Sequence, residues 1–129
     1  MPPKEAPKKI LLVEDETSLR ELYRELLFSE GYDIDVVEDG EEAFEKMKIG
    51  GYDLVLLDIR LPKMDGLQVL QNLTDDEKKN AGKIYMVTNF SDEHVIKEAY
   101  KLGAEGYLMK SALKPDEVLH EIESALGSE

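Results

Sequence analysis

The sequence predicts an α/β domain built on a parallel β-sheet. Strand-like and helix-like segments alternate five times along the chain, which is the order of a doubly wound α/β domain. Residues 10–13 and 54–57 are continuous apolar runs, as expected for strands buried on both faces of a parallel sheet. Each run is followed directly by acidic residues, which places polar groups where two buried strands end.

The first strand is predicted at residues 9–13, and the first helix at residues 17–29. Ser18 and Glu21 have the spacing of a capping box, and a start one residue earlier, from the acidic loop, is the alternative. Gly31 ends it. Four apolar residues at helical spacing predict its buried face, namely Leu19, Leu22, Leu26 and Leu27.

The second strand, residues 33–37, alternates polar and apolar residues, which is typical of an edge strand with one wet face. The second helix is predicted at residues 41–49, between Gly40 and Gly50, and the third strand at residues 53–57. We expect the helix to bury Ala43, Phe44 and Met47. Four acidic residues stand at the start of this helix: Glu38, Asp39, Glu41 and Glu42. We expect them to be solvated, and their negative charge suits the helix dipole.

The loop at residues 58–66 leads into a third helix, which should turn Leu67, Leu70 and Leu73 inward. The fourth strand is predicted at residues 84–87. Ser91 is a suitable N-cap for a fourth helix that ends at Gly103. The apolar positions of that helix are Val95, Ile96, Ala99 and Leu102.

The fifth strand is predicted at residues 106–109, and Pro115 suits the first turn of the last helix. The buried stripe of that helix is predicted at Val118, Leu119, Ile122 and Leu126. The two histidines, His94 and His120, are expected at the surface of helices. Residues 9–126 therefore form one predicted domain, with a disordered tail at residues 1–8 and a C-terminal end at residues 127–129.

Composition restricts the classes of partner. The 129 residues carry a net charge of −13, which disfavours direct binding to nucleic acid or to an anionic membrane. The absence of cysteine excludes disulfides and thiolate metal sites. No apolar run reaches the roughly 18 residues of a membrane-spanning helix, so we expect a soluble, cytoplasmic protein. Its partners should be proteins, small ions or small phosphorylated molecules.

Three acidic residues follow the two buried strands: Glu14 and Asp15 after the first, and Asp58 after the third. In an open α/β sheet, ligands bind beyond the carboxyl ends of the strands. Three carboxylates gathered there would repel one another unless a divalent cation or a lysine neutralised them. The pattern therefore indicates metal-assisted chemistry.

Five short motifs, each at the end of a predicted element, carry a resemblance to a known family. They are Glu14-Asp15, then Asp58 with Pro62 and Gly66 in the segment DIRLPKMDG, then Thr88, then Tyr107, then Lys110. In this respect residues 8–126 resemble the receiver domain of response regulators in two-component signalling. The resemblance implies a flavodoxin-like (βα)5 three-layer sandwich whose parallel five-stranded sheet has the order 2-1-3-4-5, an order known from members of the same family.

The resemblance also implies a phosphorylation site. Asp58 would accept a phosphoryl group from a histidine kinase or a histidine phosphotransfer protein. Mg²⁺ would be held by Glu14, Asp15 and Asp58, with the backbone carbonyl of Arg60 completing the shell. The protein would then be a regulatory phosphoacceptor, with self-phosphorylation and autodephosphorylation as its only chemistry, and not an enzyme.

Three further residues would turn phosphorylation into a signal. Lys110 and Thr88 would stabilise the phosphoryl oxygens. Tyr107 would respond to movement of Thr88, so that the two residues form a switch. The output surface for a downstream protein would then comprise the helix after Ser91, strand 106–109 and the last helix.

Departures from the family pattern leave alternatives open. Glu14 is one methylene longer than the usual aspartate, Asn89 replaces a small residue, and Ser111 replaces a proline after Lys110. We expect the Lys110–Ser111 peptide bond to be trans. These departures favour, as the main alternative, a pseudo-receiver that binds a partner without phosphorylation.

Two other classes fit less well. A phosphatase of the haloacid-dehalogenase type needs a second acid two residues after its aspartate, where this chain has Arg60. A flavodoxin-like electron carrier must cradle a flavin phosphate in its first loop, which the acidic residues 14–16 would repel.

Overall fold

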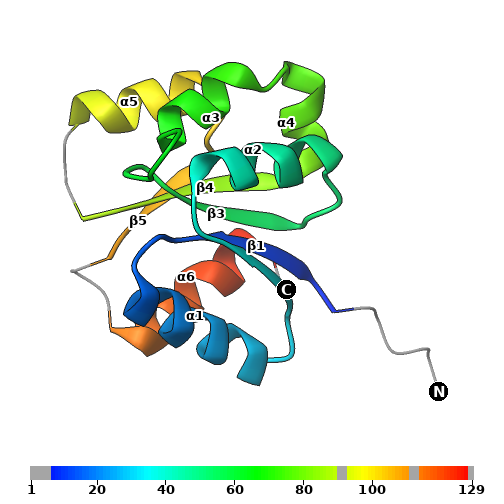
Figure 1. Cartoon of the computed structure of the whole chain (residues 1–129). Helices are drawn as coiled ribbons and strands as arrows, with labels where there is room; N and C mark the ends of the chain where they lie inside the picture. Colours follow the sequence, from blue (N-terminus) through cyan, green and yellow to red (C-terminus); the bar gives the residue numbers. More distant parts are fainter. Residues whose placement is uncertain (1–6, 90–92, 111–113, 128–129) are drawn as a thin grey trace.

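The computed structural model describes residues 7–89, 93–110 and 114–127 of the chain (Figure 1). Its single described sheet is parallel, with five strands in the order β2-β1-β3-β4-β5, which confirms the predicted flavodoxin-like topology. The edge position predicted for the second strand is also confirmed. The strands are β1 Lys9–Val13, β2 Asp33–Val37, β3 Leu54–Asp58, β4 Lys83–Thr88 and β5 Gly106–Met109.

Helices cover both faces of the sheet and make three layers (Figure 1). One face carries α1 Thr17–Ser29 and α6 Pro115–Ala125. The other face carries α2 Gly40–Ile49, α3 Gly66–Asn72, α4 Asp75–Ala81 and α5 Glu93–Lys101. Because successive side chains of a strand point to opposite faces, β1 and β3 contribute to a separate apolar core under each helical layer.

The connection between β3 and β4 contains two helices, and the second, α4, was not predicted from the sequence. Thr74 caps α4 by accepting a hydrogen bond from the Glu77 N–H at 3.1 Å, and the Glu77 side chain accepts one from the Thr74 N–H at 2.9 Å. This capping box starts a new helix after α3 has ended at Asn72. Helix α4 then packs against α2.

Two predictions at helix N-termini were wrong. The Ser18–Glu21 capping box does not form: α1 takes the alternative, earlier start at Thr17, and its N-cap Glu16 makes no side-chain cap bond. Asp39 is not solvated: its side chain is buried and accepts a hydrogen bond from the Glu42 N–H at 2.8 Å, which caps α2.

The buried face of α1 also differs from the prediction. Leu22 is 44% exposed, whereas Tyr23 is 7% exposed and belongs to the core beneath the sheet. Both positions are compatible with an amphipathic helix, and the rotation of α1 about its axis selects Tyr23. That rotation is set by packing against β2, α6 and β1, which local sequence does not encode.

The loop that follows Asp58 is held against the start of α2. The Gly40 N–H donates to the Pro62 carbonyl at 3.2 Å, and a Cβ atom at Gly40 would collide with the Met64 carbonyl oxygen. Lys63, which has a φ of 69°, places its Nζ 3.5 Å from Asp39 Oδ2. Only glycine at position 40 permits this close approach of α2 to the Met64 carbonyl, and the approach fixes the path of the chain leaving β3.

Some predictions fall outside the described residues: most of the 1–8 tail, the Ser91 cap, the Lys110–Ser111 peptide bond and the last two residues of the C-terminal end. The exposed positions of His94 and His120 are confirmed. Across the part of the chain that the structure describes, no helix has the length and apolar character needed to cross a bilayer.

Candidate functional site

The carboxyl ends of four strands meet at one cavity of about 160 Å³. Glu14 follows β1, Asp58 ends β3, Thr88 ends β4 and Lys110 follows β5. These strands are parallel and paired in register, so their ends lie at the same edge of the sheet. The cavity is lined by Glu14, Asp15, Glu16, Asp58, Arg60, Thr88, Asn89 and Lys110.

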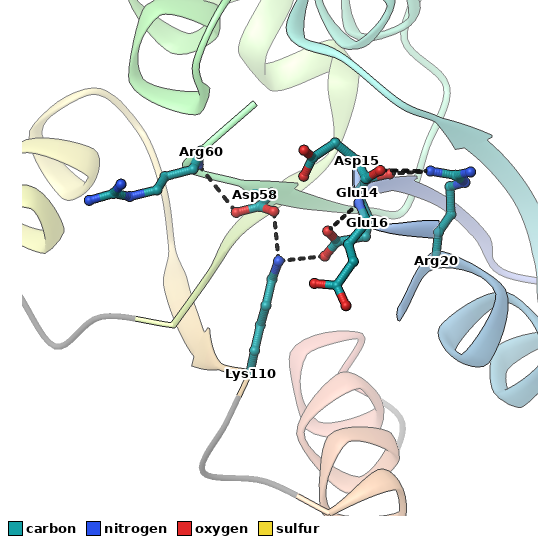
Figure 2. Close-up of polar contacts among 7 residues, drawn as sticks. All are labelled: Glu14, Asp15, Glu16, Arg20, Asp58, Arg60 and Lys110. Atoms are coloured by element: carbon teal, nitrogen blue, oxygen red, sulfur yellow. Dashed lines mark hydrogen bonds and ion pairs between the residues drawn. The ribbon is translucent and has the colours of Figure 1, made fainter. Parts of the chain in front are cut away.

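Lys110 lies between two buried carboxylates (Figure 2). Its Nζ atom is 2.6 Å from Asp58 Oδ2 and 2.5 Å from Glu14 Oε1. The other oxygens of these carboxylates accept backbone hydrogen bonds: Asp58 Oδ1 from the Arg60 N–H at 3.2 Å, and Glu14 Oε2 from the Glu16 N–H at 3.0 Å. Each carboxylate therefore has both oxygens bonded.

The charges inside the site do not balance, because two buried carboxylates share one ammonium group. Burial raises the pKa of the Asp58 carboxyl from 3.8 to about 6; the charge of Glu14 also raises it, while Lys110 and the Arg60 N–H oppose the shift. Burial by itself would lower the pKa of Lys110, but hydrogen bonds and charges from Asp58 and Glu14 outweigh it and raise that pKa. The site thus retains an excess of negative charge.

A third carboxylate completes an acidic cluster at the mouth of the cavity. One oxygen from each of Glu14, Asp15 and Asp58 lies within 4.8 Å of the others, and Asp15 is the exposed member. All the donors are oxygens, which hard cations such as Mg²⁺ prefer. The donor set and the excess negative charge both fit a divalent magnesium ion.

Arg20 orients the acidic loop, a role that was not predicted from the sequence. From α1, its Nη1 atom donates to the backbone carbonyls of Glu14 at 3.1 Å and Asp15 at 3.2 Å (Figure 2). Its Nη2 atom lies 3.5 Å from Glu38 Oε1. An arginine in the first turn of a helix that follows an acidic loop is the only sequence signal for this contact.

Of the two predicted switch residues, Thr88 lines the cavity and Tyr107 lies outside it. Thr88 is buried and lines the cavity, and its carbonyl accepts a hydrogen bond from the Lys110 N–H at 2.8 Å. Tyr107 pairs with Met86 across β4 and β5, is 43% exposed and does not line the cavity. The structure therefore holds the tyrosine outward on β5.

A larger cavity, of about 710 Å³, lies at the opposite edge of the sheet, near the amino ends of β3, β4 and β5. Four lysines line it together with three acidic residues: Lys78, Lys79, Lys83, Lys101, Asp53, Asp75 and Glu105. Lys83 Nζ donates to the Ala125 carbonyl at 2.9 Å. The other three lysines, Lys78, Lys79 and Lys101, stand in the last turns of α4 and α5, where positive charge suits the helix dipole. These positions account for the lysines without a ligand.

The site thus combines an acidic cluster and a lysine at the carboxyl edge of a flavodoxin-like sheet. The family model described as the response regulator receiver domain matches residues 10–123. The chain therefore belongs to the response regulator receiver domain family.

Relatives and solved structures agree with this assignment. The chain is 35% identical over 127 residues to the chemotaxis protein CheY of Treponema pallidum, in a match that covers 96% of this chain and 86% of the relative. It spans about half the length of three transcriptional regulatory proteins that it also matches (48 to 50%).

Two solved structures show the same fold. A CheY-like response regulator receiver domain protein from Methanospirillum hungatei has a TM-score of 0.82, with 28% identity and 94% of each chain covered. The response regulator TrrA from Thermotoga maritima, in complex with Mg²⁺ and BeF, has a TM-score of 0.76 and 38% identity, covering 92% of this chain and 98% of TrrA.

Proposed function

We propose that this domain accepts a phosphoryl group on Asp58 from a histidine kinase or a histidine phosphotransfer protein, in a reaction that requires Mg²⁺. The observation that carries the proposal is the Asp58 carboxylate held against the Lys110 ammonium inside an acidic cavity. A pseudo-receiver is less well supported, because the acidic cluster, Thr88 and Lys110 all line one cavity.

The chemistry follows from the side chains present. An oxygen of the Asp58 carboxylate attacks phosphorus; an O–P bond forms while the P–N bond to the donor histidine breaks and its electron pair stays on nitrogen. Lys110 then pairs with a phosphoryl oxygen in place of the carboxylate. The Thr88 hydroxyl donates a hydrogen bond to another oxygen. This charge stabilisation is the main help that phosphoryl transfer needs.

Mg²⁺, when bound, supplies positive charge that holds the phosphoryl oxygens and offsets the acidic cluster. Its proposed ligands are Glu14, Asp15, Asp58 and the backbone carbonyl of Arg60, directly or through water. Glu14 already binds Lys110 and the Glu16 N–H, so it also serves as the counter-ion that keeps the lysine in place. The chain thus orients both the nucleophile and the cation that stabilises its product.

The phosphoacceptor is tested with phosphoramidate as a small donor, read by intact mass. We expect wild type to gain one phosphoryl group in the presence of Mg²⁺ and to lose this reactivity in EDTA, while Asp58→Asn gains none. Asp65→Asn is the matched control, because Asp65 lies in the same loop but caps α3 outside the cavity. Equal labelling of wild type and Asp58→Asn would discard the assignment.

The metal site is tested by thermal unfolding without any phosphodonor. At a Mg²⁺ concentration ten times the dissociation constant, we expect stabilisation of wild type by about 1.4 kcal/mol. Asp15→Asn should lose most of this Mg²⁺-dependent shift, since it removes an exposed member of the acidic cluster. Asp76→Asn removes an exposed carboxylate of α4 and should keep the full shift. An unchanged shift in Asp15→Asn would remove that residue from the site.

The proposed output is a switch in which Thr88 turns toward the phosphoryl group and Tyr107 fills the space that it leaves. The surface that would carry the signal to a downstream protein comprises α5, β5 and α6. A new phosphoryl group adds about two negative charges and three acceptor oxygens, which is enough to bias such an equilibrium. Two observations support the proposal: Thr88 lines the cavity in which the phosphoryl group would form, and Tyr107 is 43% exposed.

Replacement of Tyr107 by alanine separates signalling from chemistry. We expect Tyr107→Ala to be labelled at Asp58 within about twofold of the wild-type rate, because the ring lies outside the cavity. Its affinity for a protein captured by the phosphorylated wild type should fall about tenfold, or ~1.4 kcal/mol, in a titration. Phe28→Ala, an exposed aromatic residue on α1, is the control. Full affinity in Tyr107→Ala would exclude it from the switch.

The proposal extends to the kind of partner and to the location of the protein. The acidic surface supports a protein partner and no direct contact with nucleic acid or membrane. A cytoplasmic location follows from the expected kinase or phosphotransfer partner.

A further inference from the structure

A small hollow of about 10 Å³ lies beside Lys110, which forms part of its lining. It is lined by Leu12, Val13, Glu14, Tyr23, Leu56, Val87, Leu108, Met109, Lys110 and Val118. Most of this lining is apolar and comes from the strands. Among the described residues, Tyr23 is the only residue of α1 in this lining.

The surroundings of Lys110 explain why this lining matters. A lysine side chain has four methylene groups that favour apolar contact, while its charged end favours polar groups. Here the Lys110 side chain is 6% exposed, and its Nζ atom reaches Glu14 and Asp58. The position of the ammonium group therefore depends on the apolar residues that pack around the methylene groups as well as on the two carboxylates.

Tyr23 is one of the residues that line the hollow beside Lys110. It is 7% exposed and packs in the same core cluster as Leu12, Leu56, Val87, Leu108 and Val118, all of which line the hollow. Burial raises the pKa of the Tyr23 phenol, the charge of Lys110 opposes the shift, and the charges of Glu14 and Asp58 add to it. The ring is therefore both within the apolar core and within electrostatic reach of the ionised groups.

We propose that Tyr23 is a positioning residue for phosphoryl transfer: its ring walls the hollow beside Lys110 and holds the ammonium group between Glu14 and Asp58. The inference rests on the proposed function, because Lys110 assists phosphoryl transfer only if a phosphoryl group forms on Asp58. Phosphoryl transfer depends mainly on positioned charge, and small displacements of such groups reduce rates by large factors. Tyr23 touches no reacting atom and acts through Lys110 alone.

The experiment compares three full-length variants with wild type, using Mg²⁺ and phosphoramidate. Tyr23→Ala removes the ring, Tyr23→Phe keeps it without the hydroxyl, and Leu27→Ala opens the same core cluster one turn further along α1. Leu27 is fully buried and does not line the hollow, so it controls for loss of stability alone. All rates are measured where circular dichroism shows each variant folded, and Tyr23→Leu replaces Tyr23→Ala if the latter does not fold.

A second measurement reads the position of Lys110 without phosphorylation. Acetic anhydride is added in limiting amount, and acetylation of each lysine is followed by peptide mass spectrometry. Lys110 is protected in wild type by its burial and its two ion pairs. Loss of the ring should raise its acetylation relative to exposed Lys97, which serves as the internal standard.

We expect Tyr23→Ala to slow Asp58 labelling roughly tenfold and to raise Lys110 acetylation several-fold. Tyr23→Phe and Leu27→Ala should match wild type in both measurements. A wild-type rate in Tyr23→Ala, or an equal loss in Leu27→Ala, would overturn the inference while leaving the phosphoacceptor intact. If wild type itself is not labelled, the proposed function fails, and Lys110 acetylation still decides whether the ring holds the lysine.

Discussion

Lys110→Met is expected to lower the free energy of unfolding by about 3 to 5 kcal/mol, because it removes the one ammonium group from between two buried carboxylates. Methionine retains the apolar stem and its packing. The loss therefore reports the charge, which leaves Glu14 and Asp58 facing each other without compensation. Chemical denaturation at pH 8 in EDTA measures it. The same variant should also lose labelling at Asp58.

The dependence on pH distinguishes this cause from a packing defect. In wild type, Lys110 opposes the effect of burial on the pKa of Asp58. Without the ammonium group, this pKa should therefore rise further above 6. The destabilisation should therefore be largest at alkaline pH and should shrink as the pH falls and Asp58 is protonated. Lys97→Met, which removes an exposed lysine of α5, should change stability little at any pH. A pH-independent loss in Lys110→Met would contradict the electrostatic account.

Asp58→Asn is expected to act in the opposite direction and to stabilise the domain. Burial raises the pKa of Asp58 from 3.8 to about 6, so folding favours the protonated form. Protonated Asp58 contributes its full stabilisation below about pH 4, and this stabilisation is lost as the pH rises through 6 and the carboxyl ionises. At pH 8 without Mg²⁺, the ionised carboxylate opposes folding by up to about 3 kcal/mol. Asparagine removes that opposition.

The measurement is urea denaturation of wild type and Asp58→Asn from pH 4 to pH 8 in EDTA. The two curves should be close at pH 4 and should separate as the pH rises, with the variant more stable. Asp65→Asn, at the half-buried cap of α3, is the control. A variant less stable than wild type at pH 8 would mean that the Lys110 contact outweighs burial and the Glu14 charge.

The two predictions describe one property of the site. Two buried carboxylates and one ammonium group leave an excess negative charge. That excess reduces stability and at the same time attracts a divalent cation. Removing the lysine increases the excess, whereas removing the aspartate cancels it. A site that would be more stable without its proposed nucleophile is consistent with residues retained for chemistry.

Sequence patterns predicted most of the fold and the main groups that line the site. Continuous apolar runs identified β1 and β3, and the edge strand was recognised from its alternation. The order of strands came from family resemblance. Helix α4 escaped prediction, because its seven residues are mostly charged and bury only Ala81, so no apolar period reveals it. Its signal was the capping box at Thr74 and Glu77.

By itself, the sequence determined which groups stand at the carboxyl ends of the strands, because backbone pairing in register places Glu14, Asp58, Thr88 and Lys110 at one edge. The tertiary structure alone decided which of them touch. Contacts between side chains depend on helix rotation and on packing between residues distant in sequence, and these put Tyr23 rather than Leu22 into the core beside the lysine. The same packing turned Arg20 onto the acidic loop and buried the unequal charges that raise the pKa of Asp58.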